Sequence, residues 1–99
     1  MSAAEHKNQL PIPEAAAAVP ESAEVLSAWI VNGSLHVSAQ RAFEKPELWG
    51  MMLMDFARHA SRIYAQQGVM SEREAMTRIT AVLSRQLGGG ADSGTTTFI

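Results

Sequence analysis

The stretch from Pro46 to Gln67 is the longest periodic run of the sequence and constrains the fold most. Its apolar residues recur at three- and four-residue spacing, which predicts one helix of about six turns. Pro46 suits the first helical position, and Gly68 suits the left-handed position that follows a helix end. We expect another element to cover the apolar stripe of this helix, which comprises Trp49, Met52, Leu53, Phe56, Ala60 and Ile63.

The dipeptide Asn32-Gly33 lies between two β-prone runs whose side chains alternate with period two. Asn-Gly is favoured in a two-residue type I′ turn, because both central residues need positive φ. The sequence therefore predicts a hairpin whose register starts with Val31 opposite Ser34. One face of this hairpin is almost wholly apolar, and we expect it to lie on the helix stripe. This apolar face comprises Leu26, Ala28, Ile30, Leu35, Val37 and Ala39.

Trp29 is the exception on the polar face of the hairpin, where it lies opposite His36. A large aromatic side chain there has three interpretations. It packs within the chain, on His36 or on another segment; it contacts a protein partner; or it binds a small ligand. Trp29 and His36 are therefore the first pair of candidate contact residues.

A second helix is predicted after the short link at Gly68. Ser71 and Glu74 have the spacing of a capping box, and Gly88 ends the periodic run. Its apolar stripe comprises Ala75, Met76, Ile79, Val82, Leu83 and Leu87. The short link makes the two helices an antiparallel pair. The predicted fold is α+β, with a β-hairpin followed by two antiparallel helices (ββαα).

This pattern divides the chain into three parts. Residues 1–23 combine prolines, an alanine run and scattered charges, which predicts a disordered N-terminal tail with at most a helical turn at the alanines. Residues 24–88 form the single ββαα domain. Residues 89–99 are expected to form a flexible C-terminal tail because of their glycines and polar residues.

Three segments carry a resemblance to a known family: EVLSAWIVNGSLHVS, PELWGMMLMDFARHASRIYA and SEREAMTRITAVL. Through them, residues 24–88 resemble the DUF5076 family, small bacterial proteins grouped as a domain of unknown function. The resemblance implies the same ββαα arrangement. It implies no activity, because the family has no established one.

Composition argues against several classes of function. The sequence has no cysteine, which rules out disulfides, thiolate nucleophiles and thiolate metal sites. A net charge of −2 does not suit nucleic-acid binding. No apolar run approaches the roughly 18 residues of a membrane span, and the first residues lack a signal-peptide pattern. We therefore expect a cytoplasmic protein that binds neither membrane nor nucleic acid.

Asp55 and His59 are the second pair of candidate contact residues. They lie one turn apart on the polar side of the long helix, with Arg58 nearby, so they are placed to hold each other or to share a metal. A metal needs a further ligand, and the candidates, His36 and Asp92, lie on another element and in the C-terminal tail. Acid–base catalysis needs a pocket, which the sequence does not supply. We predict a solvated or subunit-facing polar surface, without metal or cofactor.

Met51 and Met54 form a third candidate contact, because they cannot share the stripe with Met52. Flexible methionine suits adaptable apolar contacts. Either the second helix covers these side chains or a partner does, and the simplest partner is a second copy of the chain.

Two functions from different classes remain. The favoured one is a small non-enzymatic interaction protein that forms a homodimer, through its hairpin edges or its methionine-bearing helices, because a domain of about 65 residues has little core of its own. The alternative is a ligand-binding or enzymatic domain that uses the Trp29/His36 or Asp55/His59 surface. The lack of a dense polar constellation favours the first.

The last three residues, Thr97, Phe98 and Ile99, match the general form of a C-terminal tail that docks in a PDZ-type groove. The other interpretation is that this apolar end folds back onto the domain. Deletion of Phe98 and Ile99 separates the two. An unchanged melting temperature with loss of partner capture indicates docking, and a lower melting temperature indicates packing.

Overall fold

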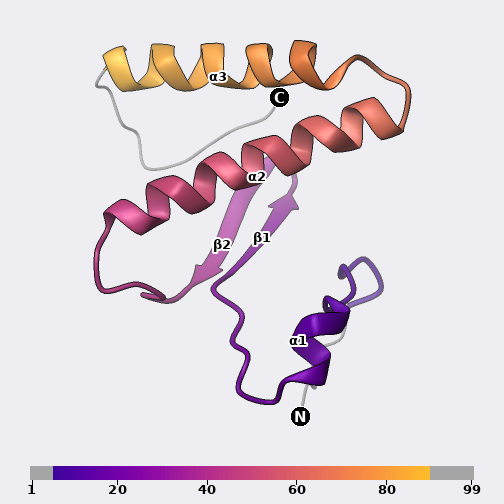
Figure 1. Cartoon of the computed structure of the whole chain (residues 1–99), viewed down its shortest axis with the longest axis vertical. Helices are drawn as coiled ribbons and strands as arrows, with labels where there is room; N and C mark the ends of the chain where they lie inside the picture. The colour runs from indigo at the N-terminus through magenta and orange to yellow at the C-terminus, as the bar shows by residue number, and fades with distance from the viewer. Residues whose placement is uncertain (1–5, 90–99) are drawn as a thin grey trace.

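A computed structural model describes residues 6–89 of the chain. A hairpin followed by a helix pair confirms the predicted α+β, ββαα arrangement, and a short additional helix precedes it (Figure 1). This additional helix lies on the alanine run of the segment expected to be disordered. The elements are α1 (Glu14–Ala18), β1 (Leu26–Val31), β2 (Ser34–Ala39), α2 (Glu47–Gln66) and α3 (Glu72–Gly89).

The hairpin has the predicted turn and register. β1 and β2 pair antiparallel, from Val31 opposite Ser34 outward, with Trp29 opposite His36. Asn32 and Gly33 have φ angles of 51° and 83°, the positive values that a type I′ turn needs at both positions. The local turn chemistry is therefore sufficient to set this pairing.

Both ends of the link between the helices are fixed by local hydrogen bonds. Gly68 has φ +72°, and its N–H donates to the Ala65 carbonyl at 3.1 Å while Val69 N–H donates to the Tyr64 carbonyl at 3.0 Å. This is the Schellman pattern expected for a glycine after a helix. On the other side, Ser71 Oγ accepts the Glu74 N–H at 3.0 Å, which is the N-cap bond of the predicted capping box, while the Glu74 carboxylate accepts from Arg78 Nε at 3.0 Å.

α3 runs back along α2, and the contact between them is made by small side chains (Figure 1). Ser61 is 0% exposed, Ala75 3% and Ala57 8%. Ser61 Oγ donates to the Ala57 carbonyl at 2.9 Å and lies 3.5 Å from Met76 Sδ. We call this contact the seam. It is the buried core of the described residues.

The apolar stripe of α2 is not the core, contrary to the prediction. Leu53, Phe56 and Ile63 are 53%, 41% and 50% exposed. At 3.6 residues per turn, the centre of the stripe lies roughly 100° around the helix from the seam. The periodicity identified an apolar face correctly, but α3 packs on the neighbouring face, where the side chains are smaller.

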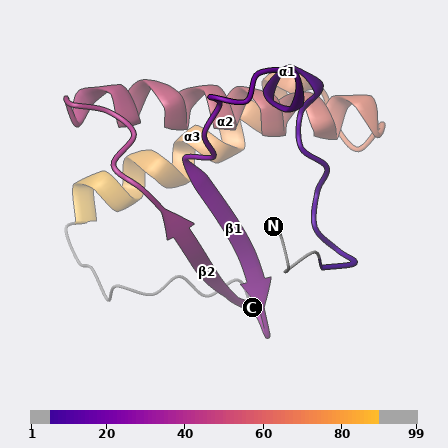
Figure 2. The same ribbon diagram turned by 90° about the horizontal axis from the view of Figure 1, so that it is seen from below.

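The apolar face of the hairpin does not lie on the helix stripe either, which corrects the second expectation about packing. No Cα atom of β1 or β2 comes within 8 Å of a Cα atom of α2 or α3. Ile30 is 65% exposed and Val37 49%. The hairpin instead slants away from the helices toward its turn (Figure 2). Most of the apolar face of the hairpin and half of the α2 stripe are thus exposed, while Trp49, Met52 and Ala60 of the stripe are half-buried.

The seam predicts the effect of enlarging a buried side chain. Ser61→Leu should destabilise the fold by about 1–3 kcal/mol, because the close contact with α3 leaves no room for extra methylenes. The matched control is Arg58→Ala on the exposed side of the same helix, where the ion pair with Asp55 is solvated and the change should stay within about 0.5 kcal/mol. Urea unfolding at one protein concentration measures both. A larger loss for Arg58→Ala would show that the buried face of α2 has been misplaced.

Candidate functional site

Trp29 is half-buried under the segment that precedes the hairpin. Its indole Nε1 donates to Ser27 Oγ at 3.0 Å. The His6 ring meets the indole edge-on, with the ring centroids 5.0 Å apart and the planes at 67°. The aromatic contact of Trp29 is therefore with His6, while its cross-strand neighbour His36 is exposed. This places Trp29 in packing within the chain, against a segment assigned from the sequence to a tail.

That segment, residues 6–25, is here called the arm. It lies on the β1 side of the hairpin, away from β2, in both views (Figures 1 and 2). The arm starts with a turn in which Gln9 N–H donates to the His6 carbonyl at 2.9 Å and Asn8 N–H donates to His6 Nδ1 at 3.0 Å. The turn holds the imidazole at the place where it meets Trp29.

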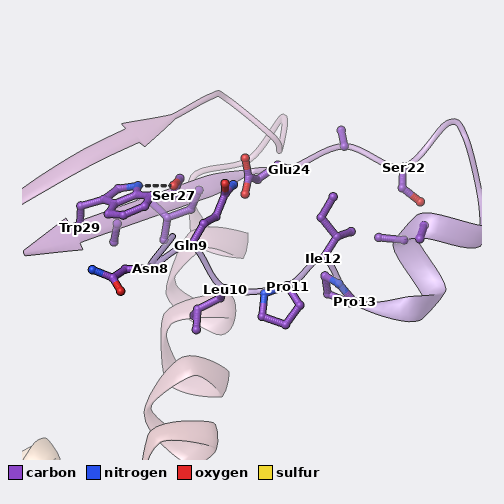
Figure 3. A pocket seen from close by; sticks show the side chains of 15 residues that line it. Asn8, Gln9, Leu10, Pro11, Ile12, Pro13, Ser22, Glu24, Ser27 and Trp29 are labelled. Atoms are coloured by element: carbon purple, nitrogen blue, oxygen red, sulfur yellow. Dashed lines mark hydrogen bonds between the residues drawn. The ribbon is translucent and has the colours of Figure 1, made fainter. Parts of the chain in front are cut away.

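An open cleft of about 610 Å³ lies between the arm and β1 (Figure 3). One wall is the stretch from Asn8 to Pro13 together with α1, and the other is the stretch from Ser22 to Trp29. Among the described residues that line it, Glu24 is the one ionisable side chain. The cleft is therefore lined by both apolar side chains and amide and hydroxyl groups, and its single charge is negative.

This cleft was not predicted from the sequence, because residues 1–23 were expected to form a disordered tail. The signal that was available is the alternation of Leu10 and Ile12 with Pro11 and Pro13. Proline fixes φ and favours extended backbone at the residue before it, so this stretch has few conformations to lose on ordering. Leu10 and Ile12 remain exposed.

Asp55 and His59 do not pair. Asp55 Oδ1 accepts from Arg58 Nη1 at 2.7 Å, and His59 is exposed. This pair lies on α2 and the Trp29/His36 pair on the hairpin, so the structure does not bring the two together. Between residues 6 and 89, no three His, Asp or Glu side chains gather in a way that suits a metal ion.

The methionines near the start of α2 have different surroundings. Met51 is exposed, whereas Met52 and Met54 are half-buried. The edge of Phe43 meets Trp49 with ring centroids 5.7 Å apart, which ties the chain after β2 to the start of α2. Met51, at 67% exposed, is thus the most accessible of these three thioethers. The fourth candidate group, Thr97, Phe98 and Ile99, lies outside the described residues.

Comparison with known proteins gives the family. A domain of unknown function, DUF5076, matches residues 9–89. The chain belongs to the DUF5076 family. The match starts inside the arm, so most of the arm is part of the DUF5076 domain and not an appendage to it. No curated protein matches the chain.

A solved structure from the photosynthetic bacterium Rhodopseudomonas palustrus is similar to this DUF5076 chain over nearly its whole length. It is 38% identical in sequence with a TM-score of 0.71, and the match covers 96% of this chain and 95% of that one. That protein is described as "a putative pyruvate dehydrogenase". In the part of the chain that the structure describes, no helix has both the length and the apolar character of a membrane span.

The contact between the arm and Trp29 predicts a change in fluorescence quenching. In a Trp49→Phe background, removal of residues 1–13 should increase acrylamide quenching of Trp29, because it takes away His6 and one wall of the cleft. Removal of residues 1–5 alone keeps that contact and should leave the quenching unchanged. Equal quenching of the two truncated proteins would show that the arm does not shield the indole in solution.

Proposed function

We propose that this DUF5076 protein is a non-enzymatic protein-interaction domain that acts as a homodimer in the bacterial cytoplasm. The observation that supports the proposal is the pair of apolar faces, on the hairpin and on α2, that do not bury each other within one chain. Exposed contiguous apolar surface on a small protein is typical of an interface.

The size of the exposed surface suits a dimer. The accessible surface of the chain is 8645 Å². If the fifteen residues outside the described part had the full surface of an unfolded chain, about 2,300 Å², roughly 6,300 Å² would remain for residues 6–89. A compact monomer of that size exposes about 4,900 Å². The excess of about 1,400 Å² is comparable to the surface that each subunit of an obligate homodimer buries, about 1,000–2,500 Å².

The dimensions of the chain agree with this comparison. The Cα radius of gyration is 15.7 Å, whereas a compact domain of 100 residues has about 13 Å. A chain that is more open than its length requires has surface that another molecule can cover.

A second copy fits this surface because the chain carries both halves of an interface. A sheet face packs on a helix face in two-layer α+β folds, and here each chain presents one apolar sheet face and one apolar helix stripe. In a two-fold dimer, the sheet face of each subunit can pack on the helix stripe of the other, since both subunits contribute the same patch. With a net charge of −2 per chain, repulsion between copies is small.

The name of the similar bacterial structure suggests another function, action on pyruvate. Pyruvate is a carboxylate, and a site that holds a carboxylate uses cationic side chains or backbone N–H groups. The cleft beside Trp29 has Glu24 as its ionisable side chain, which repels such an anion. Asp55 and Arg58 neutralise each other on an exposed helix face. These features do not favour an enzymatic role, and the interaction domain remains our proposal.

The proposal predicts a particle of twice the 10.7 kDa chain mass at tens of micromolar. Phe56→Asp should weaken the dimer at least tenfold, because it places a charge in the apolar stripe. Gln66→Asp on the polar side of the same helix is the matched control and should leave the dimer unchanged. Sedimentation equilibrium measures the affinities, and circular dichroism checks that both variants keep their helices. A monomer mass for the unmodified protein would contradict the proposal.

A further inference from the structure

The hairpin has two outer edges with different surroundings. In an antiparallel ladder, hydrogen-bonded and non-hydrogen-bonded pairs alternate, and a two-residue turn makes Val31 and Ser34 a hydrogen-bonded pair. The bond from Gln40 N–H to the Val25 carbonyl, at 3.2 Å, continues this alternation beyond the strands. The N–H and C=O groups of Leu35, Val37 and Ala39 therefore point outward from β2, and those of Leu26, Ala28 and Ile30 point outward from β1.

The arm obstructs the outer edge of β1. It runs beside β1 on the side away from β2, and the cleft between them is lined by Leu26 to Trp29 (Figure 3). A strand added there at the usual spacing of about 4.8 Å would meet the arm. β2 has no such neighbour among the described residues, and each of its residues after Ser34 is exposed.

β2 also lacks the features that keep an edge strand unpaired. Edge strands usually carry lysine, proline, a bulge or an inward-pointing charge. β2 has none of these in its sequence SLHVSA, and it pairs with β1 residue for residue. Its outward backbone groups are thus accessible and unprotected.

We propose that two copies of this chain pair β2 to β2, antiparallel, about a two-fold axis that passes beside Val37, and so form a four-stranded sheet. This inference rests on the proposed homodimer and names the surface that makes it. Val37 then lies opposite Val37 of the partner subunit, and Leu35 opposite Ala39 of the partner subunit. Three pairs that each exchange two bonds give about six backbone hydrogen bonds between the chains.

The alternative register, centred on His36, is less favourable. It aligns two outward-pointing pairs instead of three, so it forms about four hydrogen bonds. It also sets the two His36 side chains directly opposite each other, where like charges repel when both are protonated. In the register centred on Val37, His36 faces Ser38 of the partner subunit.

The sheet produced by this pairing has one continuous apolar face. Side chains two residues apart share a face, and a two-fold axis perpendicular to the sheet keeps that face common to both copies. Leu35 and Val37 of each copy then lie side by side at the centre, with Ile30 next to them on β1. The paired sheet is therefore a wider surface for the exposed α2 stripes to cover than either hairpin alone.

A pair of proline variants tests the assignment of the edge. Val37 and Ala28 are cross-strand partners whose N–H groups point to opposite outer edges, so proline at either removes no bond within the hairpin. Val37→Pro should weaken the dimer at least tenfold, and Ala28→Pro should leave its affinity within about twofold. Sedimentation equilibrium measures both. If Ala28→Pro alone weakens the dimer, or if neither variant does, β2 pairing is overturned but the homodimer stands. If the unmodified protein is a monomer, the homodimer itself is overturned.

Cross-linking tests the register and does not depend on tolerance of proline. The chain has no cysteine, so single substitutions report one position each. Val37→Cys should form a covalent dimer on mild oxidation, because directly opposed Cα atoms about 5.5 Å apart are within disulfide range. Ala28→Cys and His36→Cys should cross-link at least tenfold more slowly on non-reducing gels. Faster cross-linking of His36→Cys would overturn the Val37 register, and faster cross-linking of Ala28→Cys would overturn the choice of edge.

Discussion

The arrangement of this DUF5076 chain depends on the close approach of α2 and α3 at the seam. Ala57, Ser61 and Ala75 let the two helices come together, and the Ser61 hydroxyl is satisfied by a carbonyl of its own helix. Small side chains give close contact but remove little apolar surface from water. The larger apolar side chains of α2 are consequently left on a neighbouring face. The seam thus determines where the uncovered apolar surface of the chain lies.

The hairpin contributes structure without contributing a closed core. Its turn is specified by two residues with positive φ, so its register does not depend on contact with the helices. A two-stranded hairpin alone is marginal in water, because it has two open edges and one uncovered apolar face. If association covers that face, the free energy of binding adds to the free energy of folding. The apparent stability then depends on protein concentration. The arm stabilises one side of the hairpin through His6 and Trp29.

Local features were predictable from the sequence, and long-range ones were not. The hairpin register, the glycine after α2 and the serine cap of α3 each follow from residues that are close together in the sequence. The face of α2 that packs on α3 was misassigned, because periodicity measures hydrophobicity, whereas the seam selects for small size. The arm was not predicted, for a different reason. A proline-rich segment becomes ordered when another part of the chain packs against it, and here that part is Trp29, which is distant in sequence. Asp55 does not pair with His59, because Arg58 is a closer and stronger partner for its carboxylate.

The position of the arm has a consequence for the number of chains in an assembly. A hairpin with two open edges can pair with a strand of another chain at each edge. Repeated pairing of this kind produces cross-β fibres. With the arm beside β1, β2 is the open edge among residues 6–89, and in the proposed dimer the two β2 edges pair with each other and leave none for a third chain. Polymerisation would require the contact between His6 and Trp29 to open first. In the proposed dimer the arm would therefore block the addition of further strands, and its loss would allow the closed pair to grow into a filament.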